Sequence, residues 1–393
     1  MLALFMSVLT GISLLIWVVL LAFRDGFWQT DQRLLDLSER WNSIAPPSVA
    51  IVIPARNEAD MLPQTLPALL QQTYPGIVQI ILVNDNSSDN TAAIAEQWSQ
   101  TVHGANCHFS LISGKPLPEG WTGKLWAVHQ GIEVAQNSQL GPPDYLLLTD
   151  ADIWHSPDSL TKLVHHAIVQ DRDLVSLMVK LRVQSFWERW LIPAFVFFFA
   201  KLYPFRAVNH PNRSIGAAAG GCSLIRRQAL EKMGGIAAIR GALIDDCTLG
   251  QTIKRSGNGR IWLGLTDEIL SLRPYDSLAT LWSMVSRSAY AQLNGSPILL
   301  MGTIVGMILV YGIPIIGLIY GLLTQHGLIA LIAGLTYSLM TIAFWPMVRF
   351  YDQPWMLSFG LPAIASLYLC MTIDSARQYY QGRGGAWKGR TYS

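Results

Sequence analysis

Charge is scarce in this chain of 393 residues. Asp, Glu, Lys and Arg make up 14% of it, whereas about 25% is usual in soluble proteins, and hydrophobic residues make up 51%. The mean hydropathy is positive, at +0.31. This composition excludes a disordered chain and disfavours an ordinary soluble protein. The 28 basic and 26 acidic residues leave a net charge of +2, so no overall basic surplus favours nucleic acid as a partner.

Cysteine and nucleotide-binding glycine motifs are also sparse. The four cysteines lie far apart and form no CxxC pair, which disfavours a disulfide framework and a zinc site and indicates a reducing compartment. No GxGxxG follows the first predicted strand and no Walker A lysine is present. A dinucleotide oxidoreductase and a P-loop NTPase are therefore both disfavoured.

The missing charges are concentrated in two places. Residues 1–23 and 288–348 contain no Asp, Glu, Lys or Arg. Since a membrane-spanning helix needs about 20 apolar residues, we predict spans over 2–23, 298–323 and 328–345, with a weaker fourth over 355–373. The first could be a signal peptide, but it has neither a basic start nor an obvious cleavage site, so an uncleaved anchor is better supported.

These spans divide the chain into an anchor (1–23), a globular domain (24–297), a C-terminal region with two to three spans (298–374) and a basic tail (375–393). Arg24 after the first span favours a cytoplasmic domain. We expect an integral membrane protein of a bacterial plasma membrane. Four spans would place the basic tail outside, against the positive-inside tendency, unless one segment is re-entrant or interfacial. The tail fits either anionic lipid headgroups or plain solvation.

Within the domain, short apolar runs alternate with helical patterns. We predict strands over 48–54, 79–83, 145–148 and 173–179, with helices between them, and hence an α/β fold with a mostly parallel sheet. Ligands of such sheets bind beyond the carboxyl ends of the strands. The polar residues at those ends are Arg56, Asn57, Glu58, Asp85, Asp150 and Asp152.

Asp150 and Asp152 are alternate residues at a predicted strand end, so both carboxylates can face one Mg²⁺ or Mn²⁺ ion that also binds phosphate oxygens. Capping of the next helix is the alternative. His155 could contact the metal or a phosphate, or be structural. Asp245 and Asp246 begin another predicted helix. Their carboxylates could stabilise the helix N-terminus, or one of them could act as a general base.

A glycine turn with a lysine, GWTGK over 120–124, precedes a predicted helix. Glycine, a helix N-terminus and the Lys124 ammonium together suit an anionic ligand, although a plain surface loop has the same composition.

The order and spacing of these pieces resemble the inverting family 2 glycosyltransferases with a GT-A fold. The resemblance covers roughly residues 48–290 and rests on IVIPARNE, VNDNSSDNT, TDAD, GGCSLIRRQAL and IDDCTLG. GWTGKLWAVHQG with TDADIWH looks most like the hopene-associated glycosyltransferases, and GGCSLIRRQALEKMGG is similar to ceramide glucosyltransferases. Both relatives are membrane-anchored and act on lipids.

The resemblance implies a role for each matching residue. Pro54, Arg56 and Glu58 would line a uridine pocket, and Asp85 would contact the nucleotide. Lys124 would approach the phosphates, and Asp150 and Asp152 would hold the metal and the sugar diphosphate. Asp246 would be the catalytic base, with Asp245 in place of the usual Glu.

One family motif is incomplete. The Gln-x-x-Arg-Trp segment falls near 284–288, where only Arg287 remains; Met284 and Ser288 replace Gln and Trp. The Arg287 guanidinium can still bind a diphosphate. The missing Trp disfavours a processive enzyme and favours one transfer per acceptor.

Residues 186–205 form an aromatic segment with two prolines and only three charges. It could lie in the membrane interface, where a lipid acceptor could enter, or be a buried core helix.

The sequence therefore predicts a membrane-bound, metal-dependent hexosyltransferase that moves a sugar from a nucleotide sugar, a UDP-sugar by resemblance, to a lipid hydroxyl. Its cofactor would be Mn²⁺ or Mg²⁺. Its partners would be the nucleotide-sugar donor, the lipid acceptor and the membrane. A hopanoid, carotenoid, sphingolipid-like lipid or diacylglycerol would each fit as acceptor. The alternatives are a polyprenyl-phosphate glycosyltransferase and a catalytically silent GT-A membrane module.

Overall fold

The computed structural model describes residues 1–34, 45–100, 106–257 and 259–383. Its globular part is built on one sheet of eight strands in the order β3-β2-β1-β4-β7-β6-β8-β5. The strands are β1 (Val49–Ala55), β2 (Val78–Asn84), β3 (Cys107–Ser113), β4 (Tyr145–Thr149), β5 (Ile153–His155), β6 (Leu174–Leu181), β7 (Cys222–Arg226) and β8 (Ile261–Ser271). Most neighbouring pairs are parallel, as predicted; β7 runs antiparallel between β4 and β6, and β5 runs antiparallel to β8.

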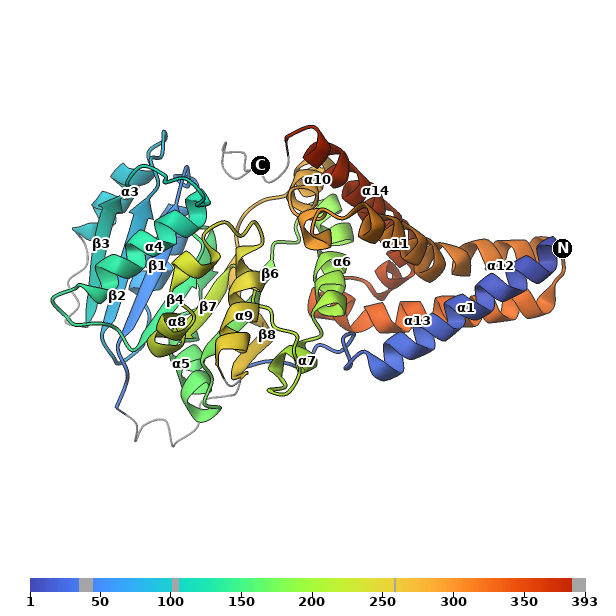
Figure 1. Ribbon diagram of the computed structural model, residues 1–393, viewed down its shortest axis with the longest axis horizontal. Coiled ribbons are helices and arrows are strands. Elements are labelled where there is room, and N and C mark those ends of the chain that lie inside the picture. Colours follow the sequence, from blue (N-terminus) through green and yellow to red (C-terminus); the bar gives the residue numbers. More distant parts are fainter. Residues whose placement is uncertain (35–44, 101–105, 258, 384–393) are drawn as a thin grey trace.

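Helices cover both faces of this sheet (Figure 1). Alternate residues of β1 enter two separate cores: Ala50 and Val52 pack in the core with α4 (Gly123–Gln136), whereas Val49 and Ile51 pack in the core with α2 (Leu62–Leu70) and α5 (Ser159–Val169). Because both faces are buried, the central strands are continuous apolar runs, which is why the sequence shows them clearly.

The four strands predicted from the sequence correspond to β1, β2, β4 and β6, with ends shifted by one or two residues. The other four were missed. The edge strand β3 alternates between half-buried and exposed residues, and β5 has only three residues. The long strand β8 contains the polar run Thr266–Asp267–Glu268, which interrupts its apolar pattern.

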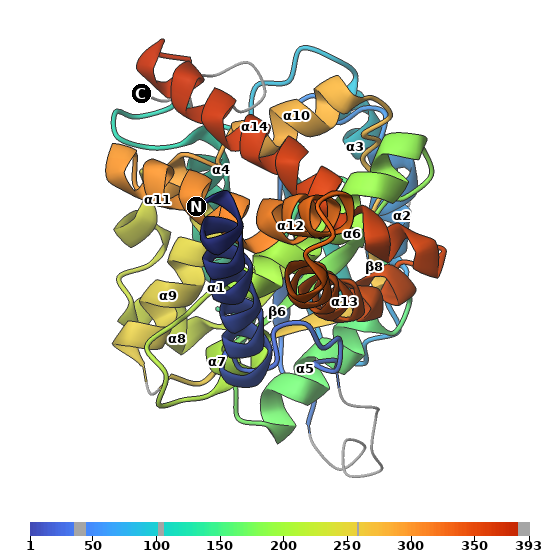
Figure 2. The same ribbon diagram turned by 90° about the vertical axis from the view of Figure 1, so that its right-hand side faces the viewer.

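Four helical segments of the described chain are long and apolar enough to cross a membrane: Leu2–Phe23, Pro297–Leu323, Gly327–Phe350 and Trp355–Tyr380. The first is α1 and the third is α13; the second consists of α11 (Pro297–Met307), η4 (Ile308–Gly312) and α12 (Ile313–Leu323), and the fourth of η5 (Trp355–Gly360) and α14 (Leu361–Tyr380). In Figures 1 and 2, α1, α12 and α13 run together away from the sheet. Their outer surfaces expose large apolar side chains such as Leu4, Leu322 and Leu331.

The π-helical turn η4 links the second of these segments to the first. The indole Nε1 of Trp17, from α1, donates a hydrogen bond of 2.9 Å to the Val310 carbonyl oxygen in that turn. Trp17 is fully buried and its ring packs edge-on against Tyr311. The widened turn thus presents a carbonyl oxygen that holds α1 in place.

The aromatic segment forms α6 (Phe186–Leu202), which lies between the sheet and the apolar helices (Figure 1). Phe197 is fully buried and packs against Phe27 and Phe344, while Phe198 contacts Tyr311 and Tyr368. The first residue of the helix, Phe186, is well exposed. Of the two interpretations of this segment, the structure favours the buried core helix, which joins the domain to its apolar helices.

The predicted basic tail begins inside a helix. α14 continues to Tyr380, so residues 375–380 are helical rather than extended, and residues 384–393 lie outside the described part of the chain.

Candidate active site

The loops after β1 and β2 interlock at the carboxyl edge of the sheet. The backbone amides of Asn57, Glu58 and Ala59 donate to the side chains of the second loop, Ser87 Oγ at 3.0 Å, Thr91 Oγ1 at 2.8 Å and Asp89 Oδ2 at 3.1 Å. In return, the Asn57 side-chain oxygen accepts from the Ser88 amide at 2.8 Å. The motifs RNE and DNSSDNT are therefore two halves of one rigid structure.

Arg56 and Asp85 lie across this junction. The Arg56 guanidinium donates to the Asp85 carbonyl oxygen at 2.7 Å and lies 3.8 Å from its carboxylate. Asp85 is buried, with 2% of its surface exposed, and its backbone amide donates to the Ala55 carbonyl oxygen. The predicted nucleotide-binding residues of β1 and β2 thus lie side by side.

Lys124 lies at the centre of a second cluster. Its Nζ is 2.9 Å from Asp150 Oδ1 and 3.2 Å from Asp245 Oδ2. Burial would lower the pKa of this ammonium, but Asp150 and Asp245 outweigh that effect and hold the pKa well above its usual value. Burial also raises the pKa of the Asp150 carboxyl, against the opposing effect of Lys124. Residues from several segments far apart in the sequence, including Pro54 and Gly220, line the same small cavity as this cluster.

Asp246 completes the cluster at the first turn of α9 (Asp245–Ser256). Burial and the neighbouring Asp245 raise the pKa of its carboxyl to about 6, while the backbone amides of Cys247 and Gly220 limit the rise. The Cys247 amide donates to Asp246 Oδ1 at 2.7 Å. A side-chain Cβ at position 220 would lie 3.4 Å from Asp246 Oδ2, in ordinary van der Waals contact with the carboxylate.

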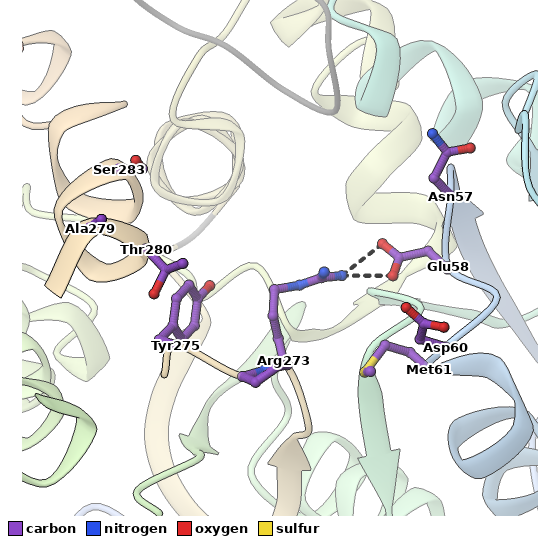
Figure 3. Close-up of a pocket in the computed structure, with 10 residues that line it drawn as sticks. Asn57, Glu58, Asp60, Met61, Arg273, Tyr275, Ala279, Thr280 and Ser283 are labelled. Carbon is purple, nitrogen blue, oxygen red and sulfur yellow. Dashed lines mark hydrogen bonds and ion pairs between the residues drawn. The ribbon is translucent and has the colours of Figure 1, made fainter. Parts of the chain in front are cut away.

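Asp152 belongs to a different charged cluster from Asp150, formed with Arg273 and Glu58. Its Oδ2 accepts from Nε of Arg273 at 2.8 Å, and Nη2 of the same guanidinium donates to both Glu58 oxygens at 2.8 and 2.7 Å (Figure 3). Burial would lower the pKa of Arg273, but Asp152 and Glu58 outweigh it and raise the pKa further. Sequence reasoning missed Arg273 because the strand before it, β8, was not predicted.

A pocket of about 480 Å³ opens beside Arg273. Glu58, Asp60 and Met61 line one side of it, and Tyr275 and Thr280 line the other (Figure 3). Burial is the main cause of the raised pKa of the Tyr275 phenol; Asp152 and Asp150 add to the rise, and Arg273 and Arg287 oppose it. Arg287, exposed at the C-terminus of α10 (Leu278–Ser286), is thus close enough to Tyr275 for its charge to affect that phenol.

His155 lies away from this cleft. The ring is buried, with 1% exposed, and its Nε2 is 2.9 Å from Thr149 Oγ1. Burial lowers its pKa to about 3, so the ring is neutral and is part of the core. Its burial and its contact with Thr149 favour the structural alternative for His155 over a contact with a metal or a phosphate.

The remaining carboxylates fit a divalent cation. No group of three or more His, Cys, Asp and Glu side chains that could hold a metal occurs in the described part of the chain. Mg²⁺, however, needs only one or two protein carboxylates when substrate phosphates and water complete its shell. The side chains of Asp150 and Asp152 are 33% and 11% exposed, and each now faces a protein cation. A metal at these two carboxylates would have to displace those cations.

Comparison with known proteins shows what part of the chain is similar to. The model of the family described as "Glycosyl transferase family 2" matches residues 50–234. The chain is 28% identical over 233 residues to the probable glycosyltransferase YdaM of Bacillus subtilis, a match that covers 56% of this chain and 51% of that protein. It is 28% identical over 145 residues to the 4,4'-diaponeurosporenoate glycosyltransferase of Staphylococcus haemolyticus, covering 37% and 32%. The chain thus spans about half the length of the first relative and about a third of the second.

The fold is also shared with a solved enzyme. The mannosyltransferase PcManGT from Pyrobaculum calidifontis, solved in complex with GDP-Man and Mn²⁺, superposes with a TM-score of 0.52 at 14% identity, over 94% of this chain and 98% of that one. This likeness confirms the predicted GT-A fold with apolar helices at both ends. The more specific likeness to hopene-associated and ceramide enzymes stays a prediction. Together with the motif geometry, these matches show that residues 50–234 are similar to glycosyl transferase family 2.

Proposed function

We propose that this protein is a membrane-bound inverting glycosyltransferase that moves one sugar from a nucleotide sugar, a UDP-sugar, to the hydroxyl group of a lipid. The observation that carries the proposal is the position of Asp246. Its carboxylate, with a raised pKa, lies in one cluster with Lys124 and Asp150 at the carboxyl edge of the sheet.

The donor's nucleotide would bind on the interlocked loops. Arg56, Glu58 and Asp85 lie at the ends of β1 and β2, where ligands of such sheets bind. The buried Asp85 carboxylate can accept a hydrogen bond from a base N–H group, and Pro54 lines the cavity between this region and Lys124. The rigidity of the loops favours a preformed nucleotide site.

Asp150 and Asp152 would hold the divalent cation, Mn²⁺ or Mg²⁺. When bound, the metal neutralises charge on the diphosphate leaving group. The chain's own cations act in the same direction. Lys124 is within reach of Asp150, and the charge of Arg287 acts on Tyr275 at the rim of the pocket, so both would stabilise negative charge that develops on the diphosphate.

Asp246 would act as the general base. A carboxylate with a pKa of about 6 is ionised near neutral pH and is a stronger base than an ordinary Asp. It would accept the proton of the acceptor hydroxyl while the oxygen bonds to the anomeric carbon and the bond to the diphosphate breaks. A single displacement of this kind inverts the anomeric configuration.

A lipid acceptor is supported by the arrangement of the apolar helices. The four candidate spans join the catalytic domain through the buried helix α6, so the site lies on the same body as the membrane-facing surface. The similar protein of Staphylococcus haemolyticus is named for diaponeurosporenoate, which agrees with a lipid-like acceptor. PcManGT was solved with GDP-Man and Mn²⁺, which agrees with a nucleotide-sugar donor and a divalent cation.

The test is transfer by the purified protein in detergent. UDP- and GDP-sugars would be offered with Mn²⁺ or Mg²⁺, with and without extracted membrane lipid, and products read by mass spectrometry. We expect a new glycolipid that requires metal. Binding of nucleotide without any product on a broad lipid panel, water-soluble acceptors included, would contradict the proposal and favour a silent GT-A module. Product formed only on polyprenyl phosphate would favour the alternative acceptor class.

A further inference from the structure

Arg273 contacts two acids that lie far from it in the sequence. It comes two residues after β8 and contacts two acids from other segments, Glu58 after β1 and Asp152 after β4. The carboxylates of Glu58 and Asp152 are largely buried, with side chains 8% and 11% exposed, whereas the Arg273 side chain is 30% exposed. The arginine is therefore the accessible member of the group, and it lines the 480 Å³ pocket.

The charges around the two aspartates are balanced by the protein itself. Asp152 is paired with Arg273 at 2.8 Å and Asp150 with Lys124 at 2.9 Å. A divalent cation that arrives alone must break the pair at Asp152 and leave the guanidinium of Arg273 with Glu58 only. Breaking a partly buried ion pair without offering a new partner is costly.

A diphosphate removes that cost. Guanidinium groups bind phosphate oxygens with two parallel N–H···O bonds, as they bind carboxylates. Arg273 already lines the pocket, so a diphosphate there can accept a hydrogen bond from the Nε–H group that Asp152 releases (Figure 3). The metal then takes the freed Asp152 oxygen, and each charge keeps a partner of opposite sign.

We infer that Arg273 is a donor-site residue that exchanges partners: it holds Asp152 in the free protein and moves its guanidinium to a diphosphate anion when a divalent cation takes Asp152, so that metal and diphosphate bind together. The inference rests on the proposed function only in identifying that anion with the diphosphate of a nucleotide sugar. Its consequence is strong coupling between two ligands that each bind weakly alone.

The test measures Mn²⁺ binding by electron paramagnetic resonance, without any sugar transfer. In the wild type we expect weak binding of Mn²⁺ alone, tightened at least about tenfold by saturating UDP and to a smaller extent by inorganic pyrophosphate. In Arg273→Gln we expect Mn²⁺ alone to bind several-fold more tightly, because Asp152 is free, and the coupling to UDP to fall to less than about threefold.

The matched control is Arg260→Gln. Arg260 directly precedes β8, as Arg273 follows it, and it pairs with Asp171 and Asp173. This variant should retain both the weak Mn²⁺ binding and the coupling. Arg273→Lys keeps the charge but not the planar fork, so it should bind Mn²⁺ weakly and show reduced coupling. If the Gln variant unfolds at lower temperature than the control and cannot be measured, the Lys variant decides.

Tight Mn²⁺ binding by the wild type without nucleotide, or unchanged coupling in folded Arg273→Gln or Arg273→Lys, would overturn the inference. The outcome is separate from that of the proposed function. If the coupling depends on Arg273 but the protein transfers no sugar, the exchange of partners is upheld and the proposed function is contradicted. If the protein transfers sugar but shows no such coupling, the proposed function is upheld and the exchange is contradicted.

Discussion

The two charged clusters of the site differ in their cation and in how completely that cation pairs the acids around it. In the first, one lysine faces Asp150 and Asp245, with Asp246 beside them, and burial together with the neighbouring negative charge of Asp245 raises the pKa of Asp246. In the second, the fork of Arg273 satisfies both Glu58 and Asp152. The first cluster therefore keeps a carboxylate available as a base, whereas the second keeps its acids occupied until a ligand arrives.

The variant Asp246→Asn should show most clearly that the first cluster acts in catalysis and the second in donor binding. An amide cannot accept the acceptor's proton, so we expect kcat to fall by about 10²- to 10⁴-fold. Donor binding, measured by UDP-sugar titration, should change little, because the charge of Lys124 and the second cluster remain. A variant that keeps most of its activity would show that no base is needed, as for an acceptor that is already an anion.

Lys124→Met removes the cation of the first cluster. We expect weaker donor binding and slower transfer, together about 10- to 100-fold in kcat/KM, as for other hydrogen bonds to charged groups. Since Lys124 opposes the rise in the pKa of Asp246, the acid limb of the pH profile should also move to higher pH. A pH profile of the variant identical to that of the wild type would contradict the coupling of Lys124 to Asp246.

The pH dependence of the wild type tests the same excess of negative charge. The base is active as a carboxylate, and its pKa of about 6 means that it becomes protonated as the pH falls through 6. We expect kcat/KM to be constant above about pH 7 and to fall about tenfold per pH unit below this pKa. In Asp246→Asn this limb should be absent from the residual activity, which serves as the control.

The smallest effect is expected from Gly220→Ala. The added methyl would lie 3.4 Å from Asp246 Oδ2 and 3.5 Å from Lys124 Nζ, which is close but tolerable contact. We expect a loss of less than about fivefold in kcat with unchanged Mn²⁺–UDP coupling, because the second cluster is untouched. At Gly221 the same change would bring Cβ to 2.9 Å from Val179, so thermal unfolding of that variant should occur at a clearly lower temperature.

The sequence predicts one cluster better than the other for a physical reason. Asp150, Asp245 and Lys124 stand at strand or helix ends within recognisable local patterns, so their positions follow from short segments. Arg273 meets Glu58 across 215 positions, at the end of a strand whose polar residues hide its pattern. Local periodicity carries no information on such long-range pairing.

Two further limits of local patterns appear in the structure. His155 stands beside the acids in the sequence, but β5 turns its ring into the core towards Thr149. The aromatic run of α6 has the composition of an interfacial helix, and only its contacts with Phe27 and Phe344 identify Phe197 as core. Replacing Phe197–Phe199 with serine would therefore test stability before it tested lipid entry.

The hydrogen bond between Trp17 and the Val310 carbonyl also has a consequence for biosynthesis. Trp17 is translated long before its acceptor, which lies 293 positions later in the chain. The globular domain is translated in the interval. The helix α1 must therefore wait without this neighbour until the turn η4 has been made. The turn at Ile308–Gly312 is thus the point at which two distant parts of the nascent chain are joined.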